Sequence, residues 1–129
     1  MDCMKKTWAV LLLPLCLAGC VTNTITNLTP SQQFRNEKGY YPVELAWNSN
    51  QQSLRDSTVT PYVVSGFDVY PMRPTIGVSN RWEAFVPIST NLDVFTYHFK
   101  VDYEYNQMGS KAGRDSKMSR VYTLRITEE

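Results

Sequence analysis

The most regular pattern in the 129-residue chain is an alternation of apolar and polar side chains over residues 95–105. The apolar members stand at every second position: Phe95, Tyr97, Phe99, Val101, Tyr103 and Tyr105. A period of two places them on one face of a β-strand, whereas a helix would scatter them around its circumference. The pattern therefore predicts a long strand with one buried face and one solvent-facing face.

Shorter segments alternate in the same way over residues 41–47, 82–86 and 122–126. Residues 60–72 predict two further strands joined by a tight turn at Ser65-Gly66, and a short first strand is expected around residues 24–28. No stretch of ten residues after Gly39 has a helical period. Short strands separated by turn residues are typical of an all-β, antiparallel β-sandwich, here of about six to seven strands. A small open barrel is the alternative.

The segment "RWEAFVPISTNLDVFTYHFKVDYEYN", residues 81–106, resembles immunoglobulin-like domains of the early-set type. Such domains often carry a strand with a tryptophan, a turn, and then an aromatic Y-x-F-x-V-D strand. The resemblance implies an immunoglobulin-like β-sandwich. Antibody domains are excluded, because the cysteine pair that joins their two sheets is absent.

The N-terminal segment reads "MDCMKKTWAVLLLPLCLAGC". Lys5 and Lys6 precede a mostly apolar run over residues 8–18, and small residues then lead to Cys20. A basic start, a short apolar stretch and small residues before a cleavage point are typical of a secretory signal peptide. The run is shorter than the about 20 apolar residues that a membrane-spanning helix needs. We therefore expect residues 1–19 to be a removable signal peptide.

The quartet Leu17-Ala18-Gly19-Cys20 resembles the bacterial lipobox, [LVI]-[ASTVI]-[GAS]-C. In bacterial lipoproteins a diacylglycerol is attached to this cysteine and the leader is cut just before it. The resemblance implies that Cys20 is the lipid attachment site. An aspartate directly after this cysteine would resemble an inner-membrane retention signal, and Val21 stands there instead, which favours the outer membrane, with the domain facing the periplasm or the cell surface. The alternative is a buried core helix that ends in a cysteine.

Cleavage before Cys20 leaves about 110 residues, the size of one domain. The polar composition of residues 20–38 predicts a mobile lipidated tether, and residues 39–129 are expected to form the sandwich. Cys3 and Cys16 leave with the leader, so the body has no disulfide, no redox pair and no cysteine metal site. Its core must therefore bury enough apolar surface without covalent support.

The net charge and the types of reactive side chain exclude several further classes of function. The formal net charge is +1, and a nearly neutral body lacks the basic patch that nucleic acid usually needs. The single histidine, His98, lies four residues from Asp102 on one strand, about 13 Å away, so the two cannot form a catalytic pair. Oxygen ligands would suit calcium, but no D-x-D-x-D-G loop is present. We expect neither a metal nor a cofactor.

A small sugar hydrolase is one alternative class, because two carboxylates facing each other across a cleft can hydrolyse a glycosidic bond. Glu44, Glu83 and Glu104 are the residues that could form such a pair. A sandwich of this size seldom holds a deep cleft, so we expect that the protein is not an enzyme.

Binding is the favoured function. Aromatic residues that could remain exposed and contact a ligand are Trp82, Tyr103 and Tyr105. Lys111 and Arg114, in the loop "NQMGSKAGRDSKMSR", could contact anionic envelope polymers. The sequence thus predicts a lipid-anchored, non-catalytic binding or assembly module with an envelope protein or a polysaccharide as partner, and no nucleic acid. Exposed edge strands offer one docking mode, and carbohydrate binding through exposed aromatics is the main alternative.

Overall fold

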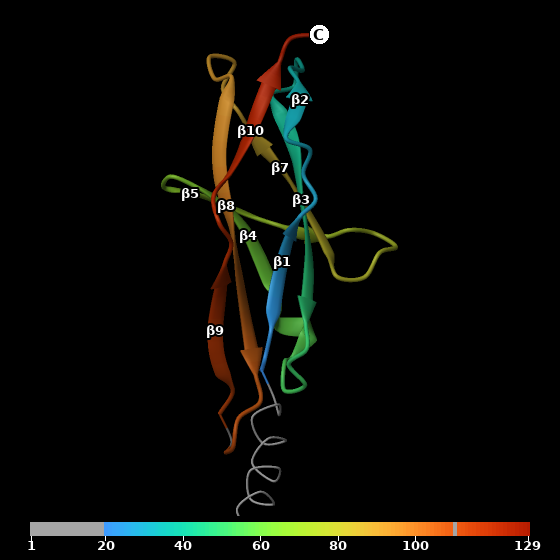
Figure 1. Ribbon diagram of the computed structural model, residues 1–129, viewed down its shortest axis with the longest axis vertical. Coiled ribbons are helices and arrows are strands. Elements are labelled where there is room, and N and C mark those ends of the chain that lie inside the picture. The colour runs from blue at the N-terminus through green and yellow to red at the C-terminus, as the bar shows by residue number, and fades with distance from the viewer. Residues whose placement is uncertain (1–19, 110) are drawn as a thin grey trace, which may run out of the picture.

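The computed structural model describes residues 20–109 and 111–129, so the expected signal peptide lies outside the described residues. Ten strands and one 3-10 turn follow one another along the described residues (Figure 1). They are β1 (Asn23–Asn27), β2 (Gln32–Phe34), β3 (Tyr40–Ser49), η1 (Asp56–Thr58), β4 (Thr60–Ser65), β5 (Asp68–Pro71), β6 (Arg73–Pro74), β7 (Arg81–Pro87), β8 (Val94–Tyr105), β9 (Gly113–Met118) and β10 (Tyr122–Thr127). The described chain is therefore all-β, as predicted.

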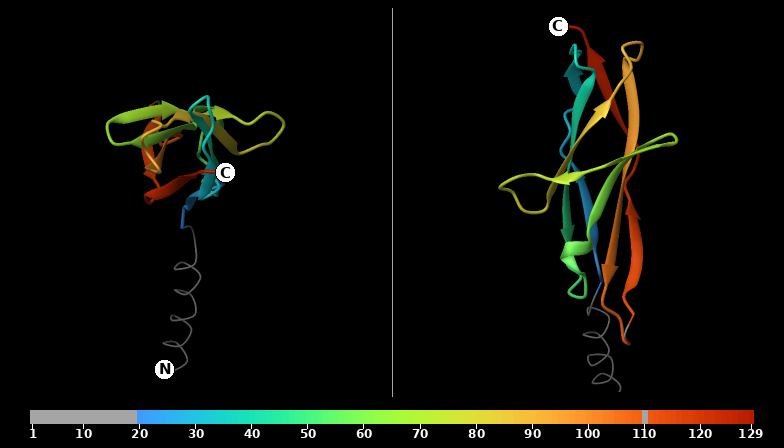
Figure 2. Two further views of the ribbon diagram at one scale, coloured as in Figure 1. Left: turned by 90° about the horizontal axis from the view of Figure 1, so that it is seen from above. Right: turned by 180° about the vertical axis from the view of Figure 1, so that it is seen from behind.

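The strands form two sheets. The first has the order β1-β3-β7-β6, and the second has the order β2-β10-β8-β4-β5, with β9 pairing along the rest of β8. All neighbours are antiparallel except β2 and β10, which run parallel. The two sheets lie face to face along the long axis of the molecule (Figures 1 and 2). They remain separate sheets, so the fold is a sandwich and not a barrel.

The strand order is that of an immunoglobulin-like sandwich, in which one sheet holds strands A, B, E and D and the other holds G, F and C. Here β1, β3, β7 and β6 take the first four places, while β10, β8 and β4 take the last three, with β5 as an added edge strand. The expected six to seven strands become ten because several are short or divided. The last one is divided between β9 and β10, where Ser119 Oγ accepts a hydrogen bond from Phe99 N at 2.8 Å.

The core lies between the inward faces of the two sheets and follows the predicted alternation. In β8, the residues from Phe95 to Tyr103 at every second position are buried, and Phe99 and Val101 have no exposed surface. In β3 the same holds from Tyr41 to Trp47. Burying one large apolar side chain stabilises a fold by about 1.5–3 kcal/mol, so these two strands alone contribute much of the stability.

The expected tether over residues 20–38 has to be corrected, because most of this segment belongs to the sandwich. β1 pairs with β3 from Asn23 opposite Ser49 to Asn27 opposite Leu45, and β2 pairs with β10. The strand expected around residues 24–28 is thereby confirmed. The polar composition of this segment gave no indication of β2, since backbone hydrogen bonds to a neighbouring strand do not require apolar side chains. Of the described residues, only 20–22 precede the first strand.

The sandwich is elongated and has two distinct ends (Figures 1 and 2). Residue 20 lies at one end, beside the β3–η1 and β8–β9 connections, and we call this the Cys20 end. The C-terminus, β2 and the β7–β8 connection lie at the other, which we call the C-terminal end. Two hairpins, β4–β5 and β6–β7, project sideways between them (Figure 2).

Candidate functional site

Cys20 is exposed and is held directly against the sandwich. Its carbonyl oxygen accepts a hydrogen bond from Asn50 Nδ2 at 3.0 Å. Thr22 N donates to Asn50 Oδ1 at 2.6 Å, and Asn50 N donates to Thr22 O at 3.1 Å. The connection after β3 thus fixes the backbone on either side of Val21, while the sulfur of Cys20 remains accessible.

Tyr103, expected as a ligand contact, is a core residue in the structure. It is 7% exposed and its ring lies 5.7 Å from the ring of Trp47, centroid to centroid. Its hydroxyl accepts a hydrogen bond from Asn23 Nδ2 at 3.0 Å and donates one to Asp115 Oδ2 at 3.3 Å. Burial, followed by the charge of Asp115, raises the pKa of Tyr103. Its role here is to join β1, β8 and β9.

Trp82 and Tyr105 are half-buried and pack against the core, so neither has a ring face wholly free for stacking. Trp82 stands opposite Leu45 in the β3–β7 pair. Tyr105 stands opposite Gly113, where a Cβ atom would lie 2.3 Å from the tyrosine ring. The glycine therefore makes room for Tyr105 to fold back over the sheet.

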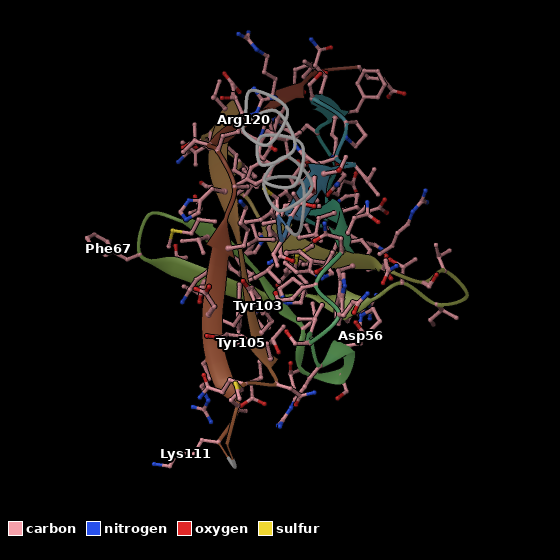
Figure 3. All side chains as sticks on the ribbon, turned by 60° about the horizontal axis from the view of Figure 1, so that its bottom comes forward. Asp56, Phe67, Tyr103, Tyr105, Lys111 and Arg120 are labelled. Atoms are coloured by element: carbon pink, nitrogen blue, oxygen red, sulfur yellow. The ribbon has the colours of Figure 1, made fainter. Side chains whose placement is uncertain are left out.

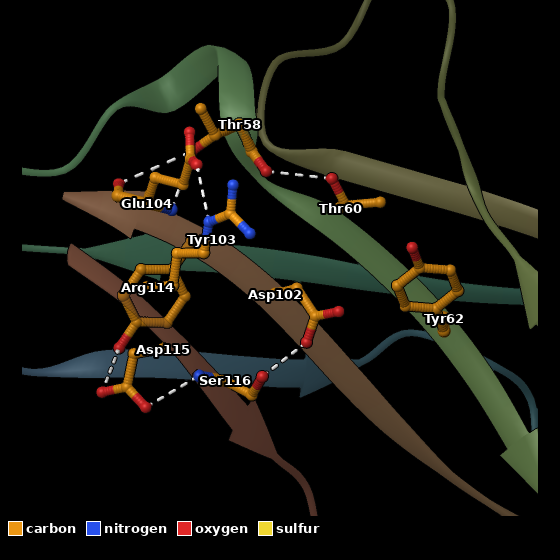
Figure 4. Close-up of a pocket in the computed structure, with 9 residues that line it drawn as sticks. All are labelled: Thr58, Thr60, Tyr62, Asp102, Tyr103, Glu104, Arg114, Asp115 and Ser116. Atoms are coloured by element: carbon orange, nitrogen blue, oxygen red, sulfur yellow. Dashed lines mark hydrogen bonds and ion pairs between the residues drawn. The ribbon is translucent and has the colours of Figure 1, made fainter. Parts of the chain in front are cut away.

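A polar groove of about 630 Å³ lies along β4, β8 and β9 (Figure 4). It is lined by Thr58, Thr60, Tyr62, Asp102, Tyr103, Glu104, Arg114, Asp115 and Ser116. Of the predicted ligand contacts, the structure brings Arg114 and Tyr103 to this groove, while Lys111 lies near the end of the β8–β9 connection (Figure 3). Trp82 lies on the other sheet.

Two carboxylates of this groove have a cationic partner, one from within its lining and one from Lys100 outside it. Arg114 Nε lies 3.1 Å from Glu104 Oε1, and Lys100 Nζ lies 3.6 Å from Asp102 Oδ1. Ser116 Oγ donates a hydrogen bond to Asp102 Oδ1 at 2.5 Å. Such a set of hydroxyls and carboxylates can exchange hydrogen bonds with the hydroxyl groups of a sugar.

Sequence reasoning missed Tyr62, Thr60 and Asp102 as a group. They belong to strands whose alternation was recognised, but the groove exists only because Thr60 pairs with Asp102 and Ser116 pairs with Asp102 from the other side. The pairing of one strand with another cannot be inferred from either segment alone. No local sequence pattern would therefore have indicated that these three residues share a groove.

Several exposed apolar side chains belong to elements of the C-terminal end, on both sheets. They come from β2, β3, β7, the β7–β8 connection and β8, and they are Phe34, Tyr40, Phe85, Leu92 and Val94. Sequence reasoning did not select them, because Phe34 fell in the expected tether and Phe85 was assigned to a polar face. Elsewhere, Phe67 on the β4–β5 hairpin is fully exposed (Figure 3), and so is Met108 in the β8–β9 connection.

Arg35 orders the backbone of the C-terminal end. Its guanidinium lies 2.6 Å from Asp93 Oδ1 and 2.6 Å from Glu128 Oε1, and it donates a hydrogen bond to Leu92 O at 3.3 Å. The hydrogen bond with Glu128 is the main cause that raises the pKa of Arg35. One side chain thus connects β2, the β7–β8 connection and the residues after β10.

Two further observations concern the described residues alone. Among residues 20–109 and 111–129, no three histidine, cysteine, aspartate or glutamate side chains are grouped so that they could hold a metal ion. The same part of the chain contains no helix of the length and hydropathy required to cross a membrane.

Comparison with known proteins identifies little that resembles this chain. No family model matches it, and no curated protein matches it. A solved structure of murine CRIg is similar in fold, with 14% sequence identity and a TM-score of 0.44, and the match covers 81% of this chain and 99% of that one. The immunoglobulin-like topology described above follows from the strand pairing of this chain itself.

Proposed function

We propose that the protein is a bacterial envelope lipoprotein, anchored in the outer membrane through acyl chains on Cys20. The observation that carries this proposal is the position of that residue. Cys20 is the last residue of the lipobox-like quartet, it is exposed, and two residues separate it from the first strand. A cysteine that starts a folded domain in this way is accessible to an acylating enzyme.

The acyl chains account for the anchoring energy. Each buried methylene contributes about 0.8 kcal/mol, so one chain binds a membrane marginally and two or more hold a protein firmly. A diacylglycerol on the sulfur of Cys20 supplies two chains. No further membrane-binding element is then required.

The folded body acts as a non-catalytic binding module that presents its C-terminal end to an envelope protein. The support is the arrangement of the two ends, because Cys20 lies at one end, while β2 and the end of β7, which carry the exposed side chains of Phe34 and Phe85, lie at the other. A module fixed in the membrane meets its neighbours at a high effective concentration, so modest affinity is sufficient.

The anchor is tested with matched cysteine variants of the full chain. Cys20→Ser should abolish metabolic labelling with a fatty acid and release the protein from the membrane fraction or stall its processing. Cys16→Ser, which changes the leader only, should leave both unchanged. Membrane retention and normal maturation of the Cys20→Ser variant would refute the proposal.

The binding surface is tested by photo-crosslinking in intact cells. A photoreactive residue at Phe34 or Phe85 should give a discrete adduct, and the adduct is then named by mass spectrometry. The control position is Asn48, an exposed residue of β3 toward the Cys20 end. Adducts from Asn48 alone would place the partner elsewhere and contradict the assignment.

A polysaccharide partner is the second candidate, favoured by the groove along β4, β8 and β9. Tyr62→Ala and Asp102→Ala should then reduce retention on cell-envelope polysaccharide at least severalfold. Trp82→Ala serves as the control, since Trp82 lies outside the groove. Equal retention of all three variants would remove this candidate.

A further inference from the structure

We infer that the Cys20 end of the sandwich rests directly on the lipid surface, with Met108 and Lys111 as its contact residues. This inference rests on the proposed acylation of Cys20. It adds an orientation and an interaction surface, because the domain would stand on the membrane with its C-terminal end pointing away.

The first step concerns the length of the link between anchor and domain. Residues 20–22 span at most about 11 Å even when extended, and they are not free to extend. Asn50 binds both Cys20 O and Thr22 N, which ties this segment to the β3–η1 connection. An acyl group on Cys20 therefore brings that connection to the level of the lipid headgroups.

The second step extends this contact to the β8–β9 connection. Asn23 Nδ2 donates hydrogen bonds to Gln51 Oε1 at 3.5 Å and to Tyr103 Oη at 3.0 Å. Asn106 N donates to Ser53 O at 2.8 Å. The start of β1, the β3–η1 connection and the end of β8 thus form one connected structure, so that anchoring at Cys20 positions all three together (Figure 1).

The third step concerns the chemistry of the two tips, which we define as residues 50–53 and residues 106–109 with Lys111. Their described side chains are mainly amides and hydroxyls, and none is a carboxylate. Met108 is 103% exposed, and Lys111 is also exposed. An apolar tip beside a cation and hydrogen-bonding amides matches the headgroup region of an anionic bilayer.

The surrounding charges agree with this orientation. Carboxylates on the neighbouring elements are Asp56 in η1, Glu104 in β8, which pairs with Arg114, and Asp115 in β9, which accepts a hydrogen bond from the Tyr103 hydroxyl. The C-terminal end, by contrast, carries Glu37, Asp93, Glu128 and Glu129, and Arg35 pairs with Asp93 and Glu128 there. Lys111 is the single charged residue among the described tip residues, so the tips are the less acidic of the two ends.

The experiment uses the mature acylated protein, purified from membranes and reconstituted into vesicles of phosphatidylethanolamine and phosphatidylglycerol. Met108→Cys supplies one free thiol, because the sulfur of Cys20 is blocked by lipid, and this thiol carries an environment-sensitive fluorophore. Nitroxide-labelled lipids should quench it at least twofold. The same label at Phe67→Cys or Leu92→Cys, both exposed positions away from the tips, should be quenched far less.

Each outcome decides one proposal. Equal quenching at the three positions, or no quenching at position 108 in a protein whose mass shows the acyl chains, would overturn the inference while the anchor stands. A mass without acyl chains would overturn the proposed function itself. Lys111→Glu should weaken the quenching at position 108 on anionic vesicles and have little effect on neutral ones, whereas unchanged quenching on both would remove Lys111 from the contact.

Discussion

Single residues decide how the last long hairpin is built, and Gly113 is the clearest case. The Tyr105 ring occupies the space where any other residue at position 113 would place its Cβ atom. A larger side chain must therefore push a half-buried ring away from the core. The pair explains why a glycine stands inside a strand, where it would otherwise weaken pairing.

Gly113→Ala should lower the free energy of unfolding by about 1–3 kcal/mol, the usual cost of overpacking. Urea unfolding of the chain from residue 20 onward, with Cys20→Ser in every variant, measures the change. In a double variant with Tyr105→Leu the added methyl should cost much less than it does alone. Strictly additive effects would contradict the close approach of the two residues.

The hydroxyl of Tyr103 makes stability sensitive to alkaline pH. Burial, with a further contribution from Asp115, raises the pKa of Tyr103 above its ordinary value of 10.0. The folded protein then keeps this proton at a pH where the unfolded chain loses it. The stabilisation is complete below about pH 10 and decreases as the pH rises toward the folded-state pKa.

Tyr103→Phe should therefore flatten the decrease of the free energy of unfolding between about pH 9.5 and 11. The control is Tyr40→Phe, which changes an exposed side chain and should leave the slope unchanged. Urea unfolding at several pH values measures both. An unchanged slope in the Tyr103→Phe variant would show that other groups control the alkaline limit.

At the scale of elements, the passage from β1 to β2 moves the chain from one sheet to the other. Asn27, the last residue of β1, organises this passage. Its Oδ1 accepts a hydrogen bond from Thr29 N at 3.0 Å, and its Nδ2 donates one to Tyr97 Oη at 3.0 Å. One amide thus turns the backbone and satisfies a hydroxyl at the edge of the core.

Asn27→Ala should destabilise the fold by about 1–3 kcal/mol, since it leaves Thr29 N and the Tyr97 hydroxyl without their partner. Asn27→Asp should cost less, because a carboxylate can accept hydrogen bonds from both groups. Thermal unfolding of the two variants separates these results. Equal stability of Asn27→Ala and the parent chain would mean that the turn does not depend on this side chain.

The alternation of β3, β7, β8 and β10 was predictable because each of these strands has one face in the core. The edge strands β2 and β6 were not. β2 pairs with a strand that is distant in sequence, Gln32 with Arg125, and β6 is only two residues long and pairs across a hairpin, Pro74 with Trp82. The composition of a polar edge strand is the same as that of a loop, so the strand can be recognised only once its partner is known.

At the scale of the whole molecule, the short connection between anchor and body should control the orientation of the domain. A flexible insert of about 12 glycine and serine residues after Val21 adds a reach of about 20 Å. Acylation and membrane retention should be unchanged. The quenching of a fluorophore at Met108→Cys should fall toward the value at Leu92→Cys, because the tips are then free to leave the surface.

The control is an insert of the same length that forms a rigid helix, because it lengthens the link without making it flexible. If the quenching at position 108 survives the flexible insert, the tips bind lipid strongly enough to act without the anchor. Such a result would show that the tips reach the membrane through their own affinity for lipid and not because Cys20 positions them.

The sequence by itself determined the buried faces, the all-β class and the candidate anchor at Cys20, because each of these is written in a local pattern. The tertiary structure alone decided that Tyr103 is a core residue, that residues 23–34 enter both sheets, and that Tyr62 and Arg114 share a groove. The physical reason is that strand register and sheet assignment arise from pairing between distant segments, and the same pairing sets which side chains remain exposed.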